Sequence, residues 1–342
     1  MAYEIFTAIE KLSGLSGVSG REESISGAII EMLPAECKWS IDPIGSLLVF
    51  KKGKTEPKKK VLLCAHMDEV GFIVTNIDES GFLRFDCVGG IDSRVAPGKA
   101  VEIGDRRVPG VIGSKSVHHQ DEKERSEVLP LHKLYIDIGA SNKLEAAQHV
   151  SPGDRIIFST PFISFGDGMI MGKALDDRAG CAVLLSILHS ELEFDCVFAF
   201  TVQEEIGCIG AVAAGYTANP DISIVVETTT AADVGGVDEP MMVCRLGFGP
   251  ALSFMDKGAI YDRDLYDLAL KTAKDFGIKA QSKLGVFGGN DSRSLQTAKQ
   301  GSRVLAVSMP CRYIHSPANV LKKSDVTDTV RLLKELLPAL EL

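Results

Sequence analysis

Four short apolar runs along this chain are each followed by side chains that can bind a metal ion or transfer a proton. The runs and their polar successors are residues 61–65 before His66, 196–202 before Glu204 and Glu205, 222–226 before Glu227, and 304–309 before His315. Runs of this length, bounded by polar or turn residues, predict buried strands of a parallel sheet covered on both faces. Because ligands bind beyond the carboxyl ends of such strands, we expect these polar side chains to share one edge of the sheet.

Helix patterns surround the predicted strands. Apolar residues recur at helical spacing around residues 5–12 and 25–33, and again in four later segments, 178–188, 261–276, 292–297 and 324–336. Further strand signals lie at 38–41 and 46–51. This alternation predicts an α/β fold in which a mostly parallel central sheet is flanked by helices.

The pattern changes between about residues 70 and 165. Short alternating stretches such as 71–77 and 82–88 are separated by Gly, Pro and Asp turns, and only 143–149 looks helical. We therefore predict two domains: an α/β domain of residues 1–69 and 165–342, and an inserted all-β, barrel-like domain of residues 70–164. Segment 115–133 is the most polar part of the chain and predicts a long exposed loop, in which His118 and His119 are solvated.

Composition narrows the class of protein. The 342 residues carry a net charge of -9 with mixed signs, which argues against nucleic acid as a partner. No apolar run approaches the ~20 residues of a membrane span, and the first residues lack a basic leader followed by an apolar core. The eight cysteines show no CxxC spacing and mostly lie in apolar patterns, which favours a reducing compartment. A cytoplasmic protein is expected.

A centre with two metal ions would give these polar residues a shared role as ligands. Two divalent ions can share a bridging carboxylate, polarise a carbonyl and activate water. Asp176, just ahead of the helix pattern at 178–188, is the candidate bridge, while His66 and His315 suit terminal positions because imidazole offers one lone pair to one metal. Asp68 could orient His66 from behind. Asp176 or Asp177 could alternatively, or in addition, cap the helix.

The adjacent residues Glu204 and Glu205 can serve two different purposes. Neighbouring side chains on an extended backbone point in different directions, so one carboxylate can bind metal while the other stays free. We assign Glu204 as the free group, a general base that takes a proton from water and returns it to the leaving amine. An isolated Glu-Glu pair is more often a solvated turn, but this pair directly follows a predicted buried strand.

Several segments together resemble a known family. The segments 66–71 (HMDEVG), 173–178 (KALDDR), 202–207 (VQEEIG) and 312–317 (RYIHSP) are similar to motifs of the M42 metallopeptidases. Within the insertion, 108–113 and 135–140 resemble that family's dimerisation domain. The resemblance spans nearly the whole chain.

The resemblance implies a cytosolic aminopeptidase with a zinc-exopeptidase-like fold and two divalent ions, zinc first and cobalt or manganese as alternatives. One ion would be held by His66, Asp176 and Glu227, and the other by Asp176, Glu205 and His315. Glu204 would act as general base, with Asp68 behind His66. The family also implies a cis Asp176–Asp177 peptide bond and homo-oligomers, built from dimers into a tetrahedral dodecamer.

Two segments depart from the family pattern. Glu227 stands where many relatives carry Asp, and Asn290 and Ser292 replace Thr and Ala in a Gly-Gly-Thr-Asp-Ala segment near the substrate pocket. These changes leave metal preference and substrate preference open.

We interpret the protein as an enzyme that hydrolyses the N-terminal residue of short peptides, with carboxylates such as Glu227 attracting the α-ammonium group. The alternatives are an amidohydrolase acting on N-acyl amino acids, a glycosidase of the endoglucanase type, which needs two carboxyl groups but no metal pair, and an assembly protein with an inactive metal site.

Overall fold

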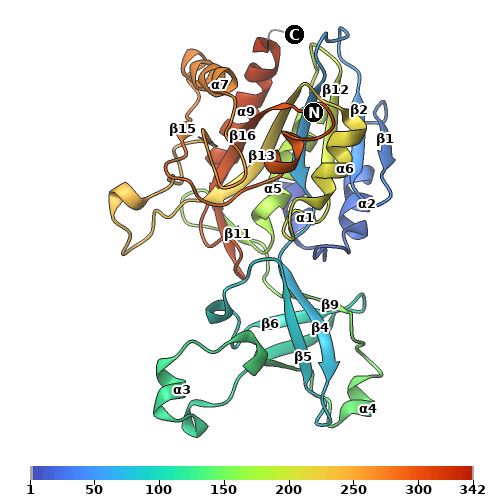
Figure 1. Ribbon diagram of the computed structural model, residues 1–342, viewed down its shortest axis with the longest axis vertical. Coiled ribbons are helices and arrows are strands. Elements are labelled where there is room, and N and C mark those ends of the chain that lie inside the picture. The colour runs from blue at the N-terminus through green and yellow to red at the C-terminus, as the bar shows by residue number, and fades with distance from the viewer. Residues whose placement is uncertain (1–2, 341–342) are drawn as a thin grey trace.

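The computed structural model describes residues 3–340 of the chain. It consists of an α/β body built on one large sheet and a smaller body built on a β-barrel, which hangs below the first in Figure 1. Each body has its own cluster of buried apolar side chains. None of the helices within residues 3–340 has the length and apolar character needed to cross a membrane.

The large sheet has eight strands, and its four central strands are parallel neighbours. β2 and β14 run antiparallel to the central strands that they join. In spatial order the strands are β1 (Lys38–Ile41), β2 (Leu47–Lys51), β12 (Cys196–Thr201), β3 (Val61–His66), β13 (Ile222–Thr230), β16 (Arg303–Cys311), β14 (Ala251–Leu252) and β15 (Gln281–Ser282).

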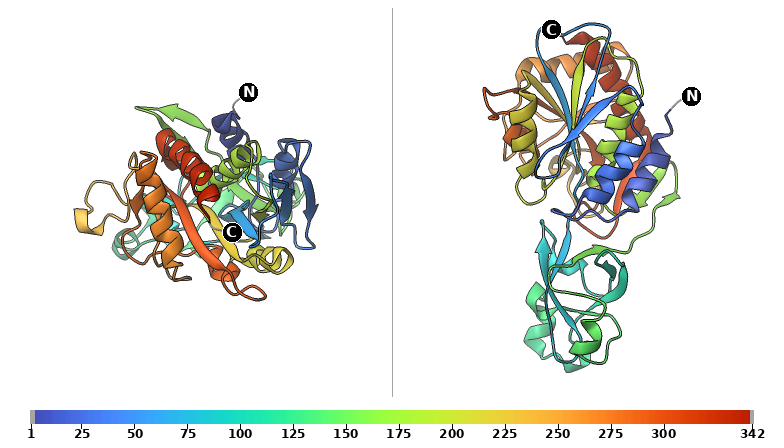
Figure 2. Two further views of the ribbon diagram at one scale, coloured as in Figure 1. Left: turned by 90° about the horizontal axis from the view of Figure 1, so that it is seen from above. Right: turned by 90° about the vertical axis from the view of Figure 1, so that its right-hand side faces the viewer.

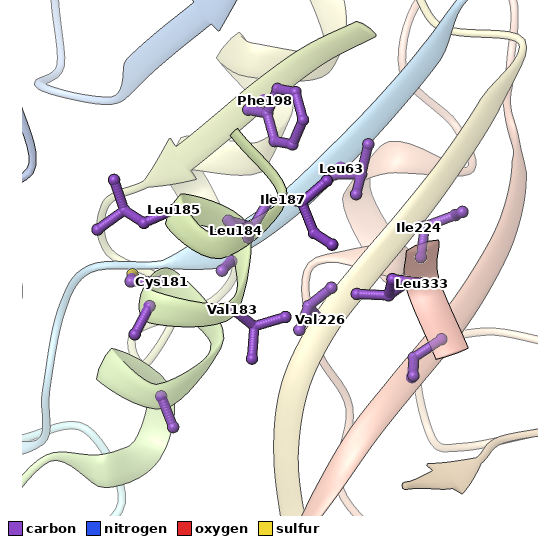
Figure 3. Close-up of a cluster of buried hydrophobic side chains, with 14 of the residues drawn as sticks. Leu63, Cys181, Val183, Leu184, Leu185, Ile187, Phe198, Ile224, Val226 and Leu333 are labelled. Carbon is purple, nitrogen blue, oxygen red and sulfur yellow. The ribbon is translucent and has the colours of Figure 1, made fainter. Parts of the chain in front are cut away.

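Helices cover both faces of this sheet, as the side view in Figure 2 shows. One face packs against α1 (Ile5–Ser13), α2 (Glu23–Glu31), α5 (Leu175–Leu188), α7 (Arg263–Asp275) and α9 (Lys323–Ala339), and the other against α6 (Ile209–Ala218) and α8 (Ser292–Leu295). Successive strand residues alternate between these two cores, so Leu63 packs beneath α5 whereas Leu62 and Cys64 face α6. Figure 3 shows Leu63 and Phe198 beside Leu184 and Ile187 of α5.

Six strands close the barrel of the smaller body. Their order is β4 (Gly71–Ile77), β5 (Leu83–Val88), β8 (Tyr135–Asp137), β7 (Val108–Gly113), β6 (Ala100–Ile103) and β9 (Arg155–Phe158). The short helices α3 (Glu122–Ser126) and α4 (Lys143–Ala146) lie in its connections. A separate three-stranded sheet joins β10 (Ile163–Phe165) and β11 (Met169–Gly172), which return from the barrel, to β17 (Asn319–Lys322).

The observed elements agree with most of the predicted ones. All four apolar runs are strands, and the predicted helices at 178–188, 261–276, 292–297 and 324–336 correspond to α5, α7, α8 and α9. The predicted mostly parallel sheet holds for its centre, whereas its outer strands are mixed. α6 was not predicted, and the segment 115–133 contains α3 and two 3-10 turns besides loop. The division of the chain into domains at residues 69/70 and 164/165 stays a prediction.

Candidate metal centre and active site

The predicted site residues meet at the carboxyl edge of the parallel strands, on the side that faces the barrel (Figure 1). His66 is the last residue of β3, and Glu204 and Glu205 follow the end of β12. His315 lies four residues beyond β16. Asp176 lies at the start of α5 and is joined to Asp177 by a cis peptide bond, which the family resemblance predicted. Because parallel strands end at one edge, four distant segments deliver these side chains to one place.

Asp176 lies between the two histidines. Its Oδ1 atom is 3.7 Å from Nε2 of His66, and its Oδ2 atom is 3.6 Å from Nε2 of His315. Glu227 approaches the same nitrogen of His66 at 3.5 Å, and Glu205 approaches that of His315 at 3.2 Å. Each imidazole therefore faces one oxygen of the shared carboxylate and one oxygen of its own second carboxylate.

These separations match the edges of a metal coordination shell. Zn–N and Zn–O bonds of about 2.0–2.2 Å at tetrahedral angles place neighbouring donor atoms roughly 3.3–3.6 Å apart. The imidazole-to-carboxylate distances of 3.2–3.7 Å lie close to that range. A set of two imidazoles and three carboxylates is also typical of divalent transition metals, so the donors fit such ions in both chemistry and spacing.

The pKa shifts of the site residues also favour bound divalent ions. Burial alone lowers the pKa of His315, but the carboxylates of Glu205 and Asp176 raise it to about 9. Burial raises the pKa of Glu227 to about 7 although His66 opposes this. Buried carboxylates resist ionisation unless positive charge compensates them, and divalent ions would provide that compensation.

Asp68 ties the end of β3 to the Glu204–Glu205 corner. Its fully buried carboxylate accepts hydrogen bonds from the backbone N–H groups of Glu204 at 2.9 Å and Glu205 at 3.1 Å, and from the Ser19 hydroxyl at 2.7 Å. Nδ1 of His66 lies 3.1 Å from the Asp68 carbonyl and 3.3 Å from its carboxylate. Asp68 thus orients both the imidazole and the adjacent glutamates.

A second buried network holds the segment that carries Asp176. Lys173 donates to both carboxylate oxygens of Glu69 at 2.9 Å, and Arg178 reaches the same carboxylate at 3.2 Å. Arg178 also donates to the Met67 carbonyl at 2.7 Å. The chain just after His66 and the chain around Asp176 are therefore clamped together by buried, charge-assisted hydrogen bonds.

Glu204 stands apart from both histidines and has different neighbours. The Cys208 thiol donates to its Oε1 atom at 3.4 Å, and Glu204, Cys208 and Asp291 offer ligand atoms within 4.8 Å of one another. Burial and nearby carboxylates, Glu227 and Asp291 among them, hold the pKa of Glu204 well above its usual range. A carboxyl group that keeps a high proton affinity beside the site can accept and return a proton.

These residues line a cavity of about 350 Å³. Six of the lining residues, which we call the acidic wall, are His66, Asp176, Glu204, Glu205, Glu227 and His315. Five others, which we call the loop wall, are Lys283, Phe287, Gly288, Gly289 and Asn290. Ligand cavities typically have volumes of about 300–1,000 Å³, so this one can take a small substrate.

The structure brings together all seven predicted site residues. Glu227 lies inside β13, which extends beyond the predicted run 222–226 to Thr230. Asp177, not Asp176, caps the helix, because its carboxylate accepts the backbone N–H of Gly180 at 3.0 Å. His118 and His119 are exposed in the smaller body and do not line the cavity.

Three residues with a part in the site were missed. Glu22 accepts the backbone N–H of Gln203 at 3.1 Å just ahead of Glu204, Thr228 donates to Asp176 at 2.8 Å, and Lys283 lines the cavity. Thr228 follows the predicted Glu227 directly, so its position was a usable signal. Glu22 and Lys283 lie in segments that carry no recognisable motif.

A family model and individual relatives all assign this chain to one family. The model of the M42 glutamyl aminopeptidase family matches residues 45–332. A protein of Acetivibrio thermocellus named as an aminopeptidase is 38% identical over 97% of this chain and 98% of its own. The glutamyl aminopeptidase of Lactococcus lactis is 29% identical over 98% of this chain and 97% of its own. The lysyl aminopeptidase of Pyrococcus furiosus is 29% identical over 97% and 96%.

Solved structures agree in fold. The TET aminopeptidase of a marine sediment Thaumarchaeota archaeon superposes with a TM-score of 0.94 at 31% identity, covering 99% of this chain and 97% of that chain. The Pyrococcus horikoshii TET1 peptidase, described as assembling into a tetrahedron or a large octahedral shell, gives a TM-score of 0.86 at 34% identity over 99% and 100%.

Proposed function

This chain belongs to the M42 family of aminopeptidases, and from that premise we propose that it removes the N-terminal residue of short peptides with two divalent ions. The observation that carries the proposal is Asp176, whose two carboxylate oxygens face two different histidines at 3.7 and 3.6 Å. A lone structural carboxylate has no need of two imidazole neighbours that are each supplied with a second carboxylate.

The proposed ligands follow from these pairs. His66, Asp176 and Glu227 would hold one ion, and Asp176, Glu205 and His315 the other, with zinc as the first choice and cobalt or manganese as alternatives. When bound, such ions polarise the scissile carbonyl and lower the pKa of water. Asp68 and Thr228 would keep the ligands in place through the hydrogen bonds that they make to them.

Glu204 is the proposed general base. It lines the same cavity as the ligands, yet it makes no ion pair with either histidine among the described residues. Its carboxylate would take a proton from the attacking water and pass it to the leaving amine. The backbone N–H of Glu204 is anchored on Asp68, which fixes where the carboxylate can reach.

Carboxylates of the acidic wall would also recognise the substrate. A free α-ammonium group pairs with this negative wall, whereas an acylated amine brings no charge and leaves buried carboxylates uncompensated. This distinguishes an aminopeptidase from a hydrolase of N-acyl amino acids.

Assembly and location are further parts of the proposal. We propose homo-oligomers built from dimers, with a tetrahedral dodecamer as the larger form, supported by the assemblies described for the Pyrococcus horikoshii relative. The barrel body would serve as the dimerisation domain. All eight cysteines are free, which fits the proposed cytoplasmic location. Light scattering of the purified protein would measure the assembly directly.

Paired substrates test the proposed function. The metal-loaded protein is assayed on aminoacyl-p-nitroanilides of several residues and on the same compounds with an acetylated amine. We expect the free amines to be cleaved at least about a hundredfold faster, because only they carry the compensating charge. Equal or faster cleavage of the acetylated compounds would favour an amidohydrolase, and release of sugars from a glucan with no peptide cleavage would favour a glycosidase.

A further inference from the structure

Lys283 places a positive charge in the wall of a cavity that is otherwise rich in carboxylates. It follows β15 directly, and its backbone N–H donates to the Leu252 carbonyl at 2.8 Å, which anchors it to the sheet. The residue is 6% exposed. It is the one lysine or arginine among the described residues that line the cavity.

The ammonium group of Lys283 is buried but has few hydrogen-bond acceptors among the described residues. Its Nζ atom donates to the Phe287 carbonyl at 3.0 Å, the single protein acceptor found for it within residues 3–340. No carboxylate of the described residues comes within 4.0 Å of it, in contrast to the buried Lys173, which contacts Glu69 through both oxygens. An ammonium has three N–H donors, so two of them have no protein acceptor in the described part of the chain.

Asp256, the carboxylate with the largest favourable effect on the charge of Lys283, already accepts hydrogen bonds from other groups. Asp256 contributes to the electrostatics of Lys283, but its carboxylate accepts the backbone N–H groups of Gly258 at 2.7 Å and Ala259 at 2.8 Å and the hydroxyl of Tyr261. Burial lowers the pKa of Lys283, as expected for a cation without a close partner. A merely structural clamp on the Phe287 carbonyl would not require a buried charge at the cavity wall, since a neutral donor would serve.

The cavity thus presents opposite charges on its two walls. The acidic wall suits the α-ammonium group of a peptide, and Lys283 in the loop wall suits an anion on the same substrate. Val243, Phe287 and Ile314 supply apolar surface for the methylene groups of a side chain. A residue that carries an α-ammonium group and a side-chain carboxylate satisfies both walls at once.

We propose that Lys283 selects peptides whose N-terminal residue is acidic, by pairing its ammonium group with the side-chain carboxylate of Glu or Asp. This inference rests on the proposed aminopeptidase function and adds the substrate class. Family membership does not decide it, because the glutamyl and lysyl aminopeptidases named above resemble this chain equally, at 29% identity.

The test compares substrates of equal shape and different charge. Values of kcat/KM are measured for the p-nitroanilides of Glu, Gln, Leu and Lys, none of which has a free α-carboxylate. Because a hydrogen bond to a charged partner contributes about 1.5–3 kcal/mol, the Glu compound should exceed the Gln compound by about 10–100-fold. The Lys compound should be the poorest, since like charges would meet in the pocket.

Variants assign the preference to the side chain. Lys283→Met keeps the aliphatic stem and removes the charge, and the Glu/Gln ratio should fall about tenfold or more. Lys283→Glu should move the preference toward Lys. Lys257→Met is the matched control, because Lys257 is exposed, does not line the cavity, and bonds by its backbone to the same loop at the Gly288 carbonyl. Thermal unfolding and metal content establish that each variant is folded and loaded.

The outcomes separate this inference from the function on which it rests. Cleavage of Leu and Gln compounds with no preference for Glu would overturn the role of Lys283 and leave the aminopeptidase intact. The same holds if Lys283→Met and Lys257→Met have equal Glu/Gln ratios. If no free-amine substrate is cleaved by the wild-type protein while acetylated ones are, the proposed function itself fails. A wild-type preference for Glu that disappears in Lys283→Met alone supports the assignment.

Discussion

The acidic wall and the loop wall of the cavity are built in different ways. Each residue of the acidic wall lies in or near the end of a strand or helix of the main core. Buried partners hold several of them: Asp68 accepts a hydrogen bond from the backbone N–H of Glu204, and Thr228 donates one to Asp176. The loop wall follows the two-residue strand β15 and runs through Phe287 to Asn290 with little regular structure. Rigid elements carry the proposed chemistry, and irregular chain carries the proposed selectivity.

This contrast suggests how the two properties can vary separately. A change in the acidic wall alters donors whose positions are set by the core, so it should affect every substrate alike. A change at Lys283 alters a side chain whose Nζ atom has one protein acceptor among the described residues, so it should affect substrates according to their charge.

Metal removal should give the largest effect. Dialysis against a chelator would leave the carboxylates of the acidic wall without compensating charge, and peptide hydrolysis should fall at least about a thousandfold. Activity should return on addition of zinc, cobalt or manganese, as followed with a Leu or Glu p-nitroanilide. Full activity in protein that elemental analysis shows to be metal-free would exclude the two-metal proposal.

The acidic wall was also the more predictable of the two. Its strands are buried on both faces and therefore appear as continuous apolar runs, and the polar residue after each run marks the sheet edge. Glu227 shows the limit of that reasoning. The end of an apolar run need not be the end of the strand, since β13 continues through the buried Glu227, Thr228 and Thr229 to the exposed Thr230.

The elements that were missed share a physical cause. α6 is built from small residues and exposes Val212 and Tyr216, so no single apolar face reveals a helix. β14 and β15 have two residues each, which is too short for any periodicity. No motif marks Lys283 in the sequence, and only the folded chain shows that it is buried beside a cavity without a carboxylate partner within residues 3–340.

Loss of the Asp68 carboxylate should weaken the acidic wall without removing a proposed ligand. Asp68→Ala leaves His66 and the backbone N–H groups of Glu204 and Glu205 without their shared acceptor. Metal affinity should fall by about 10–100-fold, measured by competition with a chromogenic chelator. Asp325→Asn is the control, because Asp325 is equally buried and accepts two backbone N–H groups, those of Gly247 and Gly249, but does not line the cavity. Equal metal affinity of both variants would remove Asp68 from the site.

Replacement of Glu22 should have a smaller effect, on the pH dependence of folding stability. Burial raises its pKa from 4.5 to about 7 in the folded protein, so the folded state binds more protons than the unfolded state between these values. The contribution of Glu22 to stability should therefore decline as pH rises from about 4.5 to 7. Glu22→Gln should reduce this decline, as measured by thermal unfolding midpoints at pH 5 and 7.5. An identical pH dependence in both proteins would contradict the assignment.

Replacement of the proposed base tests the central claim most directly. Glu204→Gln preserves the size of the side chain and leaves all five proposed metal ligands in place. Metal content and peptide hydrolysis are measured on the same preparation. We predict two divalent ions per subunit in both the variant and the wild-type protein, with kcat of the variant lowered by about 10²–10⁴-fold. Wild-type turnover in the fully loaded variant would contradict the account.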